Sequence, residues 1–152
     1  MRLSTKGRYA VMAIVDLASM NADRPVPLAD IAERQDISLS YLEQLFSKMK
    51  RGGIVRSVRG PGGGYSLARS RDAISVSDIL RSVDDETRLS RCVPASPSRC
   101  RPGDTRCATH SLWAMLSARM EAVLDGVSVA DICDGRLEVD SLVTAAQAVG
   151  DT

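Results

Sequence analysis

Three cysteines and a histidine lie close together in one stretch of this 152-residue chain. Cys92, Cys100 and Cys107 are separated by seven and six residues, and His110, the only histidine, follows three positions after Cys107. Thiolate and imidazole groups bind zinc and iron, so this set predicts a metal ion or a metal cluster. Cys133 stands apart in a predicted helix and is expected to be a small buried residue.

Two occupants are compatible with this ligand set. Zinc accepts three cysteines and a histidine, but the cysteines of structural zinc sites usually have gaps of about two to four residues. The wider gaps of this chain leave room for a larger group, and thiolates are the usual ligands of iron–sulfur clusters. The spacing favours a cluster, and zinc stays as the alternative.

The stretch that carries the cysteines needs such a clamp to be ordered. Residues 84–109 hold three prolines, five arginines and three cysteines and show no helical or strand periodicity. A loop of this length is uncommon in a packed domain unless something holds it, which disfavours unliganded thiols. A thiol-based enzyme is disfavoured too, because the only histidine that could act as its base belongs to the cysteine set. We expect the chain not to be an enzyme.

The residues before this stretch have the pattern of a winged helix. Apolar residues at helical spacing predict a helix over 5–20, a short helix after Pro27 and a third helix over about 39–50. Two strand-like segments follow, 54–58 and 65–67, joined by a glycine-rich tip. Two helices joined by a few residues and followed by a basic hairpin indicate a helix-turn-helix with a wing.

The third helix is the predicted recognition helix. Its early outward residues are placed to meet base edges or phosphates in the major groove. Glu43 has two candidate roles: it caps the helix through the spacing Ser40-x-x-Glu43, or it excludes DNA sequences that leave its carboxylate unsatisfied. The residues predicted to face DNA are Ser38, Ser40, Tyr41, Glu43 and Gln44.

Basic residues gather in the same part of the chain. Between Gln44 and Arg71 the sequence holds seven lysines and arginines and no acidic residue, whereas residues 71–152 carry 13 acidic and 9 basic residues. A stretch of one sign indicates a polyanionic partner. Arg59, in the glycine-rich tip, is expected to enter a narrow minor groove. The residues expected to contact phosphates are Lys48, Lys50, Arg51 and Arg56.

The second half of the chain predicts a dimerisation helix. Trp113, Leu116, Met120 and Val123 step by three, four and three residues, which is the spacing of an apolar seam between helices. We expect this seam to join two copies in a homodimer. Two further short helices are predicted after Ser75 and Ser128, because each serine is followed three residues later by an aspartate.

Composition restricts the class of protein. The chain is 44% apolar and 26% charged, as in ordinary globular proteins. No apolar run approaches the ~18 residues of a membrane span, and no signal-peptide pattern follows the basic N-terminus. We therefore expect a cytoplasmic protein without a membrane partner.

Three stretches carry a resemblance to a known family. MRLSTKGRYAVMAIVDLA, VPLADIAERQDISLSYLEQLFSKMKRGGIVRSVRGPGGGYSLA and CATHSLW resemble the iron–sulfur cluster regulators of the Rrf-two family of bacterial winged-helix transcription regulators. The resemblance is dense over residues 1–67 and returns over 107–132. It implies a homodimer, one 2Fe–2S cluster per subunit and control of cluster-assembly genes. By position, the cluster ligands it implies are Cys92, Cys100, Cys107 and His110.

The family that this chain resembles has branches with other functions. The usual gaps between the family's cysteines are about five residues, shorter than those of this chain. A nitric-oxide-sensing branch uses an acidic ligand near the N-terminus, where this chain has Arg8. A branch that controls cysteine metabolism lacks the cysteine loop. Both branches therefore fit less well than the iron–sulfur regulators.

The expected fold is mainly α with a small β-hairpin wing, a winged helix-turn-helix domain plus a long dimerisation helix. The expected function is a DNA-binding transcription regulator that senses iron–sulfur cluster status through a 2Fe–2S cluster. Its expected partners are a double-stranded DNA operator, a second copy of the chain and iron–sulfur cluster donors. The alternatives are a small zinc-binding or thiol-redox structural protein and a nitric-oxide-sensing relative. The expected parts are a DNA-binding domain (1–83), a cluster-binding loop (84–110), a dimerisation helix with the next short helix (111–135) and a tail (136–152).

Overall fold

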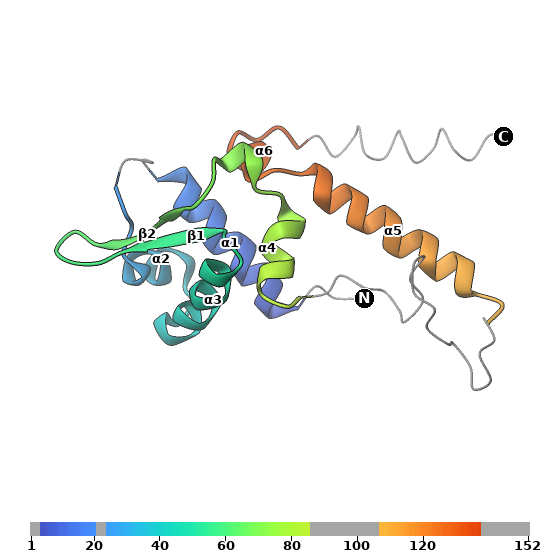
Figure 1. Cartoon of the computed structure of the whole chain (residues 1–152), viewed down its shortest axis with the longest axis horizontal. Helices are drawn as coiled ribbons and strands as arrows, with labels where there is room; N and C mark the ends of the chain where they lie inside the picture. Colours follow the sequence, from blue (N-terminus) through green and yellow to red (C-terminus); the bar gives the residue numbers. More distant parts are fainter. Residues whose placement is uncertain (1–3, 21–23, 86–106, 138–152) are drawn as a thin grey trace.

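A computed structural model describes residues 4–20, 24–85 and 107–137 of the chain. Figure 1 shows α1 to α4 and the hairpin as one body, from which α5 extends on the side opposite the hairpin tip. This arrangement confirms the predicted fold class. The elements are α1 (Thr5–Ser19), α2 (Leu28–Gln35), α3 (Leu39–Arg51), β1 (Val55–Val58), β2 (Gly64–Leu67), the 3-10 helix η1 (Arg71–Ala73), α4 (Val76–Ser82), α5 (His110–Gly126) and α6 (Val129–Cys133).

One apolar stripe of α3 lies at the centre of the core. Its members recur at helical spacing, so they share one face of the helix. The Phe46 ring meets the ring of Tyr65 on β2 edge to face, with the centroids 5.0 Å apart. The stripe therefore joins the recognition helix to the wing. It consists of Leu42, Leu45, Phe46 and Met49, each at most 2% exposed.

A buried ion pair joins α1 to α2. The Asp16 carboxylate, 7% exposed, accepts hydrogen bonds from the Arg34 Nε and Nη2 atoms and from the Gln35 amide. The Asp16 carboxylate raises the pKa of the Arg34 guanidinium. Because a buried carboxylate needs such partners, the contact fixes α2 against α1.

The turn between α2 and α3 is set by backbone geometry. Asp36 takes a left-handed conformation with φ 52° and donates its N–H to the Ala32 carbonyl, which ends α2. Ile37 is buried directly after it, and its N–H also bonds Ala32. Asp tolerates this conformation better than most residues. The chain then starts α3 at Leu39.

The two capping boxes predicted from the sequence are confirmed. Ser75 with Asp78 opens α4, and Ser128 with Asp131 opens α6. The hydrogen bonds from Ser128 lower the pKa of the Asp131 carboxyl. The starts of the two helices pair side by side, and Val129 is completely buried in the core. After α5, the chain thus returns to the winged-helix body.

The wing is a two-stranded antiparallel hairpin that is tied to the turn before α2. Val55 pairs with Leu67 and Val58 with Gly64. Val26 and Tyr65 exchange two backbone hydrogen bonds of 2.8 Å each.

Among the residues described, no helix is both long and apolar enough to pass through a bilayer.

Gly64 is a position at which the wing leaves no room for a side chain. Its φ is +152°, and a Cβ at this place would meet the backbone carbonyl of Val26. We expect Gly64→Ala to lower the free energy of unfolding by about 1–3 kcal/mol, because backbone atoms cannot move aside cheaply. Thermal or urea unfolding measures the effect. Gly126→Ala, at a glycine with open space around it, is the matched control and should change stability little; equal losses in both variants would contradict this packing.

Candidate nucleic-acid interface and metal-ligand residues

The outward face of α3 carries the residues predicted to face DNA. Ser40, Glu43 and Gln44 are exposed, on the side opposite the buried stripe. Tyr41 is half-buried, and its ring meets the Tyr9 ring edge to face at 6.1 Å. Ser38 is exposed and is the N-cap of the helix, where its Oγ accepts the Tyr41 N–H at 3.4 Å. Four of the five side chains therefore reach solvent around one helix end.

The capping role considered for Glu43 is wrong. A box made by Ser40 and Glu43 requires the helix to begin after Ser40, but α3 begins at Leu39 with Ser38 as the cap. Ser40 lies inside the first turn. Within the part of the chain that the structure describes, the exposed Glu43 carboxylate makes no hydrogen bond or ion pair. The negative charge of Glu43 is therefore available to a molecule that binds this face of α3.

The stretch with seven basic residues holds no acidic residue of its own, but three of the seven have acidic partners, so not all of its positive charge is uncompensated. The partners come from distant parts of the chain, which the local sequence does not reveal. Arg56 and Lys50 instead contact hydroxyl groups of the hairpin, those of Ser66 and Ser57. The ion pairs are Lys48–Asp84 at 2.7 Å, Arg69–Asp78 at 3.2 Å and Arg71–Asp134 at 3.0 Å.

The wing tip presents Arg59 to solvent. Arg59 is exposed, and Gly60 and Gly62 take φ values of +101° and +72°, which L side chains rarely adopt. The N–H of Gly63 closes the turn onto the Gly60 carbonyl at 2.9 Å. Among the described residues, Arg51 and Arg59 make no ion pair, so positive charge stays unneutralised at the end of α3 and at the wing tip.

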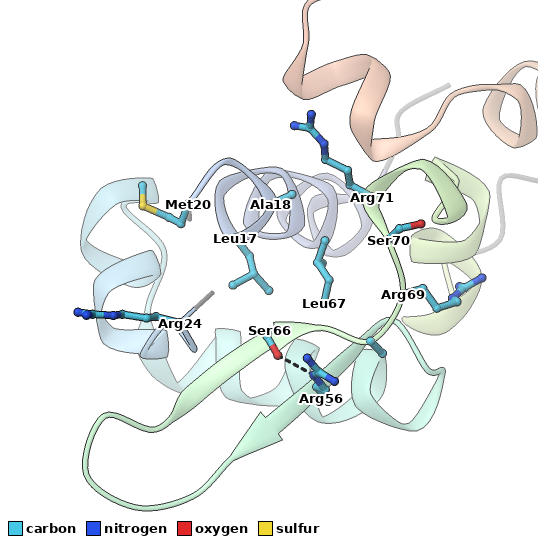
Figure 2. Close-up of a pocket in the computed structure, with 11 residues that line it drawn as sticks. Leu17, Ala18, Met20, Arg24, Arg56, Ser66, Leu67, Arg69, Ser70 and Arg71 are labelled. Carbon is cyan, nitrogen blue, oxygen red and sulfur yellow. Dashed lines mark hydrogen bonds between the residues drawn. The ribbon is translucent and has the colours of Figure 1, made fainter. Parts of the chain in front are cut away.

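A hollow of about 450 Å³ lies between the end of α1 and the hairpin, and Figure 2 shows the residues that line it. Leu17 and Leu67 lie at its floor, and Arg56 bonds Ser66 at its edge with a distance of 3.0 Å. The labelled Arg24, Arg69 and Arg71 point outward rather than toward one another (Figure 2). The arginines add positive charge beside the wing but do not converge on a small anion.

Two of the four predicted metal ligands are described, and they share one turn. Cys107 is half-buried, and its carbonyl accepts the N–H of His110 at 3.0 Å. His110 is the first residue of α5 and is only 5% exposed. Cys92 and Cys100 lie outside the described residues, and among the described ones no group of three or more His, Cys, Asp or Glu side chains is placed to hold a metal ion.

The fourth cysteine lies elsewhere. Cys133 is half-buried on α6 and packs against the core, with its Sγ 3.6 Å from the Ser19 Oγ. Cys107 and Cys133 are separated along the chain by the whole of α5. The thiol and imidazole near the start of α5 thus have the donor chemistry of a cluster or zinc site, and Cys133 has a packing position.

Helix α5 has two faces of different character. His110, Ala114 and Ser117 are buried on one face. Near the C-terminal end of α5, Arg81 of α4 pairs with Glu121 at 3.2 Å and Asp125 at 2.9 Å. The hydrogen bond that Arg81 donates to Glu121 is the main cause that raises the pKa of the Arg81 guanidinium. Outside this buried face lie Leu112, Trp113 and Val123, which are 47%, 39% and 48% exposed, together with the half-buried Leu116 and Met120.

A helix-turn-helix with an exposed recognition helix and a basic hairpin defines a winged-helix DNA-binding protein. The family model Rrf2, described as "Iron-dependent Transcriptional regulator", matches residues 3–135. The chain belongs to this Rrf2 family of transcriptional regulators, whose members are not enzymes.

Relatives and solved structures agree with this assignment. The chain is 49% identical to the HTH-type transcriptional regulator IscR of Yersinia enterocolitica over 136 residues, 90% of this chain and 81% of the relative. It is 51% identical to a putative HTH-type regulator of Azotobacter vinelandii over 94% of this chain and 85% of the relative. The structure of T. potens IscR matches with a TM-score of 0.72 and 37% identity, covering 90% of this chain and 89% of that one. CymR, the global cysteine regulator of B. subtilis, matches with a TM-score of 0.73 and 34% identity, covering 88% and 97%.

The sequence patterns do not indicate the contacts around Asp84. They place Asp84 at the start of the irregular loop, but it pairs with Lys48, and its carbonyl accepts the Lys6 Nζ at 2.7 Å. Asp85 accepts a hydrogen bond of 2.6 Å from Ser4, the N-cap of α1. Lys48 and Lys6 precede Asp84 by 36 and 78 positions, and no spacing rule relates residues that are so far apart in the sequence. The only sequence signal is the pair of acidic residues directly after α4.

The assignment of the α3 cap gives a direct stability test. We expect Ser38→Ala to destabilise the protein by about 1 kcal/mol, because it removes the acceptor for the Tyr41 N–H. Glu43→Ala should change the free energy of unfolding by no more than about 0.5 kcal/mol, the range of neutral surface substitutions. Thermal unfolding of the two variants beside the unsubstituted chain measures both effects. A loss in Glu43→Ala larger than the loss in Ser38→Ala would contradict the assignment.

Proposed function

We propose that this chain is a transcription regulator that senses iron–sulfur cluster status through a 2Fe–2S cluster, one per subunit, and controls cluster-assembly genes. The observation that carries the proposal is the placement of Cys107 and the buried His110 on one turn at the start of α5. Relatives named IscR, at about half identity over most of the chain, support it.

A double-stranded DNA operator is the proposed partner of α3 and the wing. Because the apolar stripe is buried, Ser40, Glu43 and Gln44 face outward and can enter a major groove. Arg59 is proposed to read a minor groove beside it. Ser38 and Tyr41 at the helix start, and Lys48, Arg51 and Arg56 beside it, are proposed to contact the backbone or base edges. Glu43 is proposed to exclude operators that cannot satisfy its carboxylate.

The proposed cluster ligands are Cys92, Cys100, Cys107 and His110. Three thiolates and a neutral imidazole suit iron, and ligation supplies free energy that stabilises the folded chain. The proposed cluster-binding part, 84–110, begins at Asp84 beside α3 and ends at the first residue of α5. A change in this part can therefore reach both the recognition helix and the dimerisation helix. Cluster donors are the proposed source of the group.

A second copy of the chain is the proposed cover for the exposed face of α5. Leu112, Trp113 and Val123 stay 39–48% exposed, so the described elements of the same chain leave much of their apolar surface uncovered. Apolar residues at seam spacing are typical of helix pairing between subunits. A symmetric dimer also presents two copies of α3, as operators with two half-sites require.

The cluster ligands are tested by two cysteine variants. We expect Cys107→Ala, purified anaerobically, to lose its iron and its visible absorption, because a thiolate ligand is missing. Cys133→Ala is the matched control and should keep both, since Cys133 packs on the core. Iron analysis and absorption spectroscopy measure the result. Retention of iron by Cys107→Ala, or a colourless protein with one zinc per chain, would contradict the proposed cluster, and the zinc result would support the alternative.

The dimer is tested at Leu116, in the middle of the exposed face of α5. Leu116→Glu should convert a dimer into a folded monomer, because a charge cannot be buried unpaired in an apolar seam. Sedimentation or light scattering at micromolar concentration measures the mass. Ala118→Glu places the same charge on an exposed position away from this face and should stay dimeric. An unsubstituted chain that is monomeric at this concentration would overturn the dimer.

A further inference from the structure

An ion pair connects the recognition helix to the turn after α4. The Lys48 Nζ of α3 lies 2.7 Å from the Asp84 Oδ2. Separate contacts hold the backbone of this turn in place: the Asp84 carbonyl accepts the Lys6 Nζ at 2.7 Å, and Asp85 accepts the Ser4 hydroxyl at 2.6 Å. The Asp84 carboxylate is therefore presented to Lys48 by a turn that α1 fixes.

Lys48 lies on the part of α3 that would meet DNA. It follows Gln44 by one helical turn and is not part of the buried stripe. The side chain of Lys48 is 34% exposed and that of Asp84 is 77% exposed, so a solvent-borne anion can reach the ammonium group. An exposed pair of this kind contributes little stability, and it can be exchanged for another anion. A DNA phosphate is such an anion.

We propose that Asp84 competes with DNA phosphates for Lys48 and thereby lowers the affinity of the chain for duplex DNA. The proposal rests on the proposed binding of DNA through α3. Lys48 must leave the Asp84 carboxylate before it neutralises a phosphate, and the carboxylate left behind repels the DNA backbone. The hydrogen bond from Lys48 lowers the pKa of the Asp84 carboxyl, so Asp84 is ionised at neutral pH.

A positioning role for Asp84 predicts the opposite result. If the carboxylate held the Lys48 side chain ready for a phosphate, its removal would weaken DNA binding. If it competes, its removal strengthens binding. The sign of the change in affinity therefore separates the two roles.

Asp84→Asn is the variant that tests the competition. Asparagine has almost the same shape and tolerates the left-handed backbone at this position, where φ is +55°. The Lys6 contact is kept, because it is made to the backbone carbonyl. We expect the variant to bind a non-specific DNA duplex about two- to fivefold more tightly. The slope of log K against log salt should steepen by up to about 0.9, the value of one added phosphate contact.

Two further variants make the test specific. Asp134→Asn removes the same charge from a carboxylate that pairs with Arg71, outside α3 and the hairpin, and should give a smaller gain. In a Lys48→Ala background, Asp84→Asn should gain no more than Asp134→Asn does. All proteins are full-length, purified anaerobically, and matched in iron content and melting temperature. Fluorescence anisotropy at several salt concentrations gives the affinities.

Three results would overturn the competition: a gain no larger than that of Asp134→Asn, a loss of affinity, or an undiminished gain without Lys48. Each of these leaves the proposed function intact as long as the unsubstituted chain binds duplex DNA. Absence of binding by the unsubstituted chain at low salt would instead overturn the proposed DNA interface, and this proposal with it. The cluster is not required for the comparison, so its absence affects neither outcome.

Discussion

The burial of one stripe of α3 is the constraint on which the rest of the structure depends. Leu42, Phe46 and Met49 have no exposed surface, and full burial of such side chains contributes about 1.5–3 kcal/mol each. Rotation of α3 about its axis would expose them. The opposite face, with Ser40 and Gln44, is therefore held outward. The contact between Phe46 and Tyr65 extends the same constraint to the wing, which keeps helix and hairpin in one relative position.

The basic residues around α3 and the hairpin differ in whether an acidic residue pairs with them. Arg51 and Arg59, at the end of α3 and at the wing tip, are exposed and without ion pairs within the described chain, whereas Arg69 and Arg71, near the start of η1, are paired with aspartates. The cations best placed for phosphates are thus those that the fold leaves uncompensated. Lys48 is the exception, because the turn after α4 supplies Asp84. In the sequence, Cys92, the first predicted metal ligand, follows eight residues after Asp84, and the ion pair of Asp84 with Lys48 connects this turn to the recognition helix.

Much of the fold can be predicted because its signals are local. Helical spacing predicts α1, α3 and α5, and the serine–aspartate spacing predicts the starts of α4 and α6. Contacts between distant residues carry no such signal, so the sequence does not predict the pairs Asp16–Arg34 and Lys48–Asp84. The start of α3 is ambiguous in the sequence because Ser38 and Ser40 are both good caps. In the structure Ile37 is buried and α3 starts directly after Ser38. The spacing rules for helix caps do not take the burial of Ile37 into account. Of the predicted metal ligands, Cys107 and His110 are placed, and Cys92 and Cys100 lie outside the described residues.

We propose that cluster status changes which DNA the chain binds. The most direct measurement is an anaerobic titration of a panel of duplex sequences with cluster-loaded and cluster-free protein at one salt concentration. We expect the two forms to rank the duplexes differently, because the proposed cluster-binding part begins beside α3 and ends at α5, so ligation can change how the dimer presents its two reading surfaces. Equal affinities of both forms for every duplex in the panel would contradict it.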